Sequence, residues 1–280
     1  MNPLILILMA QLAIGLGLFT VAGPLTRRSS GVWAPLGLVA LVLMLCFGLN
    51  RLDPAIAIHA LGAKAVACLE LTGIFMPTMF VFGIAARRLP KKSDRRAIVV
   101  LSVLAAIFAI RSGWWMTAPI GSGVPELGGT QLDAHGVCLQ STGYTCVAAS
   151  MVTLLHARTI DATETEMARL AHTSVGEGTT DSRAIWALED KLKGTPYRVS
   201  YESLPLMPDR RSTATHRRSL LECPKPCLVQ LDWGLFVSHM VPVLEASPER
   251  VILGDPLEGR REMPTEEFAR QWKGMAVIVE

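Results

Sequence analysis

The segment from residue 140 to residue 157 reads QSTGYTCVAASMVTLLHA. Its second half is apolar and rich in alanine, so we expect a helix over residues 144–157 with Cys146 in the first turn. A cysteine is nucleophilic as the thiolate, and the positive end of a helix favours that anion. Gln140 lies six residues earlier, where its side-chain amide can donate to an oxyanion. The segment therefore predicts a cysteine nucleophile at the start of a helix, with a glutamine beside it.

The general base for such a cysteine is expected far away in the sequence but near it in the fold. His239 opens an apolar strand predicted at residues 239–245. Asp255 follows the next predicted strand, residues 250–253, where its carboxylate can accept a hydrogen bond from the imidazole. We therefore predict one catalytic site that needs no metal and no organic cofactor, formed by Cys146, His239, Asp255 and Gln140.

Each of these residues also has a structural interpretation. A cysteine in an apolar helix is usually a small core residue. A histidine at the start of a strand is mostly structural, and Asp-Pro is a common turn signal. The order and spacing of the residues together favour the catalytic interpretation.

The remainder of residues 131–280 reads as a compact domain of mixed α and β type. A capping box, Thr163-x-x-Glu166, predicts the start of a second helix. A third helix is expected from Asp181 to Lys193, ending at Gly194. Further elements are predicted as strands at 197–201, 227–232 and 275–279 and as a short helix at 265–272.

Residues 1–119 have a different composition. Half of all residues in the chain are hydrophobic and the mean hydropathy is +0.37, and the long apolar runs are concentrated in this region. A helix that crosses a bilayer needs about 20 predominantly apolar residues. We therefore expect a transmembrane bundle with an interfacial segment at 54–66 and spans at about 4–25, 32–49, 67–86 and 97–118.

Basic residues predict the orientation of this bundle. They cluster at Arg27-Arg28 and between Arg87 and Arg96, and such loops face the cytoplasm. The start of the chain is uncharged, which favours a retained first helix over a cleaved signal peptide. The Gly/Pro linker at 120–130 and the domain at 131–280 would then lie on the extracytoplasmic (periplasmic) side of the inner membrane. The net charge of +3 is too small to indicate a nucleic-acid partner.

Several motifs together resemble a known family. They are Gln140-x5-Cys146 before an alanine-rich helix, Ser238-His239 before an apolar strand, RVILGDP at residues 250–256 and MPTEEFARQWKG at residues 263–274. In combination they are similar to the double-glycine, bacteriocin-processing cysteine peptidases. The resemblance covers about residues 131–280 and implies a papain-like fold. It also implies roles for Cys146 as nucleophile, His239 as base, Asp255 as its orienting group and Gln140 as oxyanion donor.

The sequence thus predicts a membrane-anchored cysteine peptidase whose partners are the lipid bilayer and a peptide or protein substrate outside the cytoplasm. Two alternatives are a cell-wall peptide endopeptidase or amidase and a catalytically silent peptide-binding module. Gly128-Gly129 is either a plain linker or a site of self-cleavage. Cys223 and Cys227 can form a small disulfide, with Cys138 as another possible partner.

Overall fold

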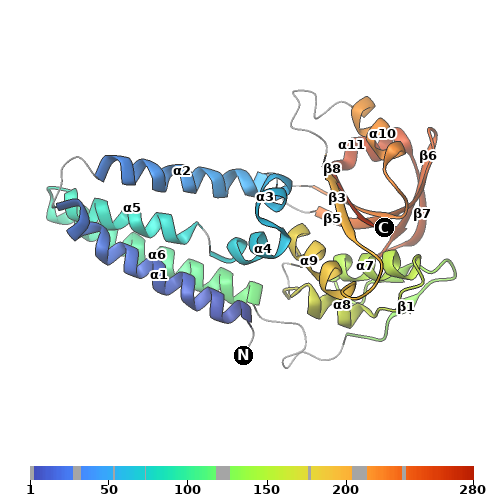
Figure 1. The fold of residues 1–280 in the computed structure, drawn as a ribbon, viewed down its shortest axis with the longest axis horizontal. Coiled ribbons are helices and arrows are strands. Elements are labelled where there is room, and N and C mark those ends of the chain that lie inside the picture. Colours follow the sequence, from blue (N-terminus) through green and yellow to red (C-terminus); the bar gives the residue numbers. More distant parts are fainter. Residues whose placement is uncertain are drawn as a thin grey trace. The chain divides into compact units, whose positions relative to one another are not determined.

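The computed structural model describes residues 3–27, 33–52, 54–72, 74–117, 127–175, 178–203, 213–234 and 238–280. The chain forms two compact units, Met1–Thr117 and Ala118–Glu280 (Figure 1). Residues 120–126 of the expected linker lie outside the described residues, and Leu127 to Thr130 have no regular secondary structure.

The amino-terminal unit is helical. Its described helices are α1 (Pro3–Arg27), α2 (Trp33–Leu52), α3 (Pro54–Leu61), α4 (Ala63–Thr72), α5 (Phe75–Arg88) and α6 (Lys92–Thr117). Helices α1 and α5 approach closely because Gly83 has no side chain. A Cβ at this position would lie 2.4 Å from the carbonyl oxygen of Phe19. Leu8, Phe75 and Met79 belong to the apolar cluster between the packed helices.

The third expected span, at 67–86, is wrong as a single helix. Helix α4 ends at Thr72 and α5 begins at Phe75, with Pro77 in the first turn of α5, where a missing N–H is tolerated. The expected interfacial segment is also divided, at Gly62, whose φ is +83°. Within the described residues, no helix on its own has both the length and the apolar composition to cross a bilayer. The helices Ala63–Glu70 and Phe75–Arg88, which meet at an angle of 45°, have that length and apolar composition only when they are taken together.

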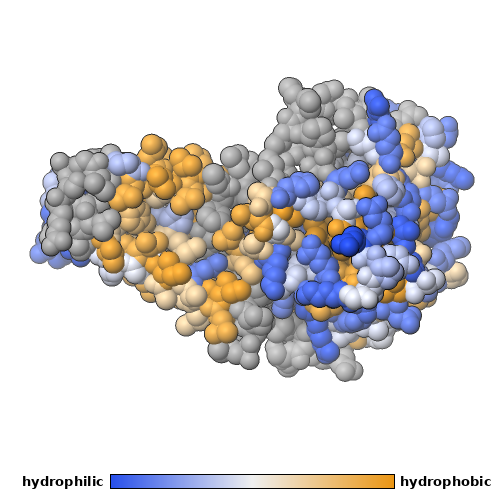
Figure 2. Space-filling view, viewed as in Figure 1, coloured by the Kyte–Doolittle hydropathy of each residue, from blue (hydrophilic) through white to orange (hydrophobic). Residues whose placement is uncertain are grey.

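Many large apolar side chains of this unit are exposed. They include Met9 on α1 and Leu38 on α2, each 61% exposed, and Phe108 on α6, 72% exposed. Figure 2 shows apolar residues gathered over these helices, whereas the visible face of the carboxy-terminal unit is mostly hydrophilic. The surface of the amino-terminal helices is therefore apolar over a wide area.

The carboxy-terminal unit is built on an antiparallel sheet with the strand order β3-β8-β4-β5-β6-β7. Its strands are β3 (Val199–Ser203), β4 (Cys227–Asp232), β5 (Ser238–Ala246), β6 (Arg250–Asp255), β7 (Gly259–Pro264) and β8 (Trp272–Val279). A separate short hairpin pairs β1 (Gln131–Leu132) with β2 (Cys138–Leu139).

Helices cover this sheet. They are α7 (Cys146–His156), α8 (Glu164–Leu170), α9 (Asp181–Lys191), α10 (Thr213–Glu222) and α11 (Thr265–Gln271). Helices α7 to α9 lie on one side of the sheet and α10 and α11 on the other (Figure 1). The core between the sheet and α11 includes Val241, Val251 and Phe268, each less than 1% exposed. This unit is of the mixed α and β class expected from the sequence.

Local sequence signals explain several helix ends. The hydroxyl oxygen of Thr163 accepts the N–H of Glu166 at 3.1 Å, which caps α8 as predicted. Helix α9 ends at Lys191, and Gly194 adopts a φ of +81°, the left-handed conformation that glycine tolerates. The predicted strand 227–232 is confirmed at both ends.

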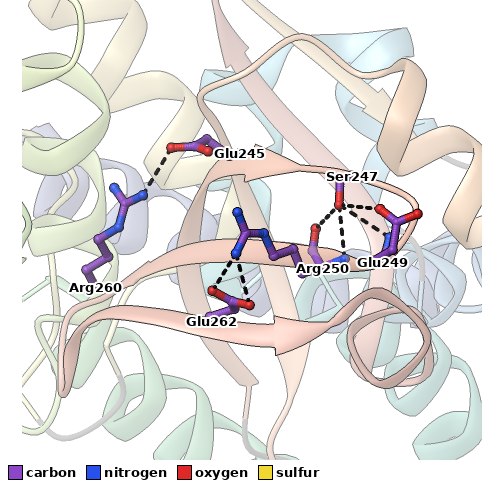
Figure 3. A network of polar contacts seen from close by, with 6 residues as sticks. All are labelled: Glu245, Ser247, Glu249, Arg250, Arg260 and Glu262. Carbon is purple, nitrogen blue, oxygen red and sulfur yellow. Dashed lines mark hydrogen bonds and ion pairs between the residues drawn. The ribbon is translucent and has the colours of Figure 1, made fainter.

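Strand β7 was not predicted as a strand, because its exposed charged residues break the apolar pattern. On the charged surface of β5 to β7, Arg250 pairs with Glu262 at 3.2 Å and Arg260 with Glu245 at 3.1 Å (Figure 3). Exposed ion pairs of this kind contribute about 0–1 kcal/mol each. They mark the solvent-facing part of the sheet rather than a site.

Candidate active site

Cys146 is the first residue of α7, which begins two residues after the predicted start at residue 144, and it is partly buried. The preceding residue, Thr145, occupies the N-cap position, but its side chain makes no capping hydrogen bond to the helix. Its hydroxyl instead bonds within the loop, donating to the carbonyl oxygen of Thr142 at 3.1 Å and accepting the N–H of Thr142 at 3.2 Å. The N–H groups of the first turn of α7 are thus left without a side-chain cap beside the thiol.

Hydrogen bonds from its interior fix α7 against the sheet. The hydroxyl of Ser150 donates to the carbonyl oxygen of Met240 on β5 at 2.8 Å. The hydroxyl oxygen of Thr153 accepts the N–H of Cys138 on β2 at 2.9 Å. Gly254 on β6 permits close packing, since a Cβ there would lie 3.3 Å from the methyl group of Thr153. The helix that carries Cys146 is therefore held on the strands that carry His239 and Asp255.

His239 and Asp255 form a buried pair. Nε2 of His239 lies 2.9 Å from Oδ1 of Asp255, and the two residues are 3% and 1% exposed. Oδ1 also accepts the N–H of Leu257 at 2.9 Å, and Nη1 of Arg261 lies 3.8 Å from Oδ2. Burial opposes ionisation, but these hydrogen bonds and the positive charges of His239 and Arg261 lower the pKa of Asp255 below its usual value.

The imidazole of His239 also reaches the thiol. Burial acts to lower its pKa, but hydrogen bonds to Asp255 and Cys146, with the charges of both groups, outweigh burial and raise the pKa of His239 to about 9. Since Asp255 occupies Nε2, the other ring nitrogen, Nδ1, is the one available to Cys146. The structure thus brings together the cysteine, the histidine and the aspartate that the sequence predicted.

Gln140 lies on the loop before α7, next to the turn that follows Asp255. Its N–H donates to the carbonyl oxygen of Pro256 at 2.8 Å, and its Nε2 donates to the carbonyl oxygen of Thr142 at 2.7 Å. Its buried Oε1 has no hydrogen-bond partner among the described residues. The glutamine is therefore tied to the loop of the nucleophile, and its role as oxyanion donor stays a prediction.

Two further residues of the site were not found from the sequence. Glu164, which is fully buried, accepts the N–H of Ser141 through Oε1 at 2.9 Å and so braces the loop before Cys146. The ring of Trp233 stacks on that of His239. The capping box marks the helix start beside Glu164, but no sequence pattern places Trp233 against an imidazole that lies six residues further along the chain.

Among the described cysteines, Cys138, Cys146, Cys223 and Cys227 are free thiols. The side chains of Cys223 and Cys227 lie within hydrogen-bonding contact of each other. Burial and the nearby carboxylate of Glu164 raise the pKa of Cys138 to about 12, so this thiol is inert as a nucleophile. Cys138, Cys223 and Cys227 do not lie against the imidazole of His239, whereas Cys146 does.

No curated protein matches the chain. Among solved structures, the peptidase domain of Streptococcus ComA, a bi-functional ABC transporter involved in quorum sensing, shares 18% identity over 50% of this chain and 94% of that chain, with a TM-score of 0.41. A double glycine motif protease from an AMS/PCAT transporter, in complex with its leader peptide, shares 18% identity over 54% and 93% of the two chains, with a TM-score of 0.41. The peptidase domain of Streptococcus mutans ComA shares 18% identity over 51% and 96%, with a TM-score of 0.37.

The family itself follows from the sequence match. Residues 135–280, more than half of the chain, match the model of the Peptidase C39 family. The match begins four residues after the start of the resemblance seen in the sequence and extends to the same last residue. The chain therefore belongs to the Peptidase C39 family, and its carboxy-terminal unit is a cysteine peptidase.

Proposed function

We propose that Cys146, His239 and Asp255 are the triad with which this peptidase hydrolyses peptide bonds. The observation that carries the proposal is the single imidazole of His239, which is hydrogen-bonded on one side to Asp255 and on the other to Cys146. A histidine between a carboxylate and a thiol can hold the proton of the thiol as an imidazolium. Its raised pKa supports that arrangement.

The reaction then proceeds through an acyl-enzyme. The thiolate of Cys146 adds to the carbonyl carbon of the scissile bond, and the carbonyl oxygen takes up the negative charge. In the proposed reaction, the uncapped N–H groups at the start of α7 and the side-chain amide of Gln140 stabilise this oxyanion. The imidazolium of His239 donates its proton to the leaving amine. His239 afterwards removes a proton from a water molecule as its oxygen adds to the acyl carbon. The C–S bond then breaks, which releases the acid and restores the thiolate of Cys146 beside the imidazolium.

The side-chain amide of Gln140 has two N–H groups, and only one of them is free for the oxyanion in this scheme. One N–H of its amide donates to Thr142, which leaves the second N–H of Nε2 for the oxyanion.

The substrate proposed is a peptide or a flexible protein segment outside the cytoplasm. The double glycine motif protease described above is in complex with a leader peptide, and a leader peptide is one member of this class. The cell-wall endopeptidase or amidase differs in substrate and shares the same thiol chemistry.

The amino-terminal helices are proposed to lie in a lipid bilayer. Apolar side chains such as Met9, Leu38 and Phe108 are more than half exposed on α1, α2 and α6, and burial in lipid would remove this surface from water. The segment from Arg87 to Arg96, which joins the end of α5 to the start of α6, is basic, and this favours the cytoplasmic side for it. The peptidase unit would then lie on the opposite, extracytoplasmic side.

The membrane proposal has its own test. Fusions of alkaline phosphatase and of a green fluorescent protein to Glu280 report opposite compartments in bacterial cells. We expect an active phosphatase fusion, a dark fluorescent fusion and retention of the chain in membranes after alkaline carbonate washing. Extraction by carbonate, or a bright fluorescent fusion, would contradict the proposal.

The test of the chemistry is hydrolysis of a proteome-derived peptide library by the full-length protein purified in detergent. New amino termini are identified by mass spectrometry. We expect products that are absent with Cys146→Ser and His239→Ala and unchanged with Glu262→Gln, an exposed surface control. Equal products from the wild type and Cys146→Ser would refute the proposed nucleophile. Peptide binding without Cys146-dependent products would favour the silent binding module.

A further inference from the structure

Trp233 provides an aromatic surface that the mechanism above does not use. The centroid of its ring system lies 4.2 Å from that of the His239 imidazole, and the two planes are inclined by 17°. Trp233 is 49% exposed, whereas His239 is 3% exposed. The indole therefore covers the imidazole on one side while much of its own surface meets solvent.

Strand pairing explains why the two rings meet. Strands β4 and β5 are antiparallel neighbours, and Asp232 at the end of β4 pairs with Ser238 at the start of β5. Trp233 follows Asp232 directly, and His239 follows Ser238. The connection between the strands thus places the indole beside the imidazole at the end of the sheet.

We infer that Trp233 is a positioning residue that holds the His239 ring between Cys146 and Asp255 and favours its imidazolium form. This inference rests on the proposed triad. Stacking restricts rotation of the imidazole about its side-chain bonds, so both hydrogen bonds keep their geometry. The face of an indole is also the strongest aromatic partner for a cation, which stabilises the imidazolium relative to the neutral ring.

Other charged groups near the imidazole act on its proton as well. Asp255 and Cys146 bond to the ring and favour the imidazolium. Two cations contact residues that bond to or precede His239. They are Arg261 on β7, beside Asp255, and Lys273 on β8, which donates to Ser238. Asp232 lies at the end of β4. Substitution of Trp233 removes none of these charged groups, so the variants differ from the wild type only in the stacked ring and in the freedom it allows the imidazole.

The experiment is an NMR titration of the histidines in the full-length protein, labelled with 13C at histidine and purified in detergent. Its six histidines are compared in the wild type, Trp233→Leu and Trp233→Phe, with His239 assigned from its absence in His239→Gln. Leu221→Ala, which removes an exposed apolar side chain on α10, is the matched surface control. Labelling of Cys146 by iodoacetate is measured in the same samples.

We expect Trp233→Leu to lower the pKa of His239 by about half a pH unit and to slow labelling of Cys146 about two- to fivefold. Trp233→Phe keeps a ring that can stack and is expected to recover most of both losses. Leu221→Ala is expected to match the wild type. If Trp233→Leu fails to fold, Trp233→Phe alone decides, with a smaller fall of the pKa of His239 in the same direction.

Two results would overturn the inference. One is a pKa of His239 that is unchanged in Trp233→Leu, and the other is an equal loss in Trp233→Leu and Trp233→Phe. Failure of the proposed triad gives a different result, because the wild type itself would then label no faster than an ordinary thiol. The titration of His239 reports on Trp233 in either case.

Discussion

Replacement of Asp255 by asparagine separates the charge of the triad carboxylate from its shape. The amide keeps an oxygen that can accept the N–H of Nε2 of His239, now 2.9 Å from Oδ1. It loses the negative charge that favours the imidazolium. Burial of the imidazole, which acts against the charged form, is then less well compensated.

The magnitude follows from the pKa of His239. Asp255 and Cys146 together raise this pKa from 6.5 to about 9 against the effect of burial. One pH unit corresponds to about 1.4 kcal/mol, so their combined preference for the imidazolium is at least about 3.5 kcal/mol. If Asp255 supplies about half of it, Asp255→Asn lowers the pKa of His239 by about one pH unit. At neutral pH most His239 rings stay protonated at either pKa, so the loss of Cys146 labelling in Asp255→Asn appears mainly above about pH 8.

The assay is the histidine titration by NMR, read together with the pH profile of iodoacetate labelling of Cys146. An anionic reagent is attracted by the imidazolium, so its rate falls as the pH rises through the pKa of His239. We expect this alkaline fall near pH 9 in the wild type and about one pH unit lower in Asp255→Asn. Glu262→Gln removes an exposed carboxylate of the same sheet and serves as control. An unchanged alkaline fall in Asp255→Asn would refute the reasoning.

Three further predictions concern the support of the site. Glu164→Ala removes the acceptor of the Ser141 N–H and should slow labelling of Cys146 about tenfold. Glu164→Gln keeps an acceptor oxygen, and its labelling rate should stay within about threefold of the wild type. Equal labelling rates in the two variants would contradict the bracing role of Glu164. Gly254→Val crowds the contact between α7 and β6 and should lower the free energy of unfolding by about 1–3 kcal/mol, measured with urea. Folding raises the pKa of His239, so protonation of its imidazole stabilises the folded protein. This contribution to the free energy of unfolding should be full below about pH 6.5 and be lost as the pH rises through about 9. The difference in urea midpoint between the wild type and His239→Gln should therefore shrink over that range, and a constant difference would contradict it.

The sequence predicted the site best where short spacing or an apolar run determines which residues come together. Gln140 and Cys146 lie on a single loop and helix start, so their spacing alone predicted their proximity. His239 lies at the start of β5, before an apolar run, and Asp255 lies at the end of β6, after an apolar run. These two runs identified the strands from the sequence. The pairing of β5 with β6 then brought the two side chains together.

Other features depend on packing that no local pattern records. Glu164 looks in the sequence like an ordinary acidic residue of a first helical turn, and only the fold buries it against Ser141. Trp233 reads as one aromatic residue in a turn. The break between α4 and α5 was missed because hydropathy sums over a window and is insensitive to Pro77.

The most direct test of the account is the rate at which iodoacetamide labels the full-length protein at neutral pH. The proposed triad predicts rapid labelling that disappears in Cys146→Ala and slows at least about tenfold in His239→Ala. Such a result would establish Cys146 as a thiol activated by the imidazole. Labelling no faster than that of a free cysteine, or unchanged in both variants, would contradict the central claim that Cys146 and His239 perform the chemistry.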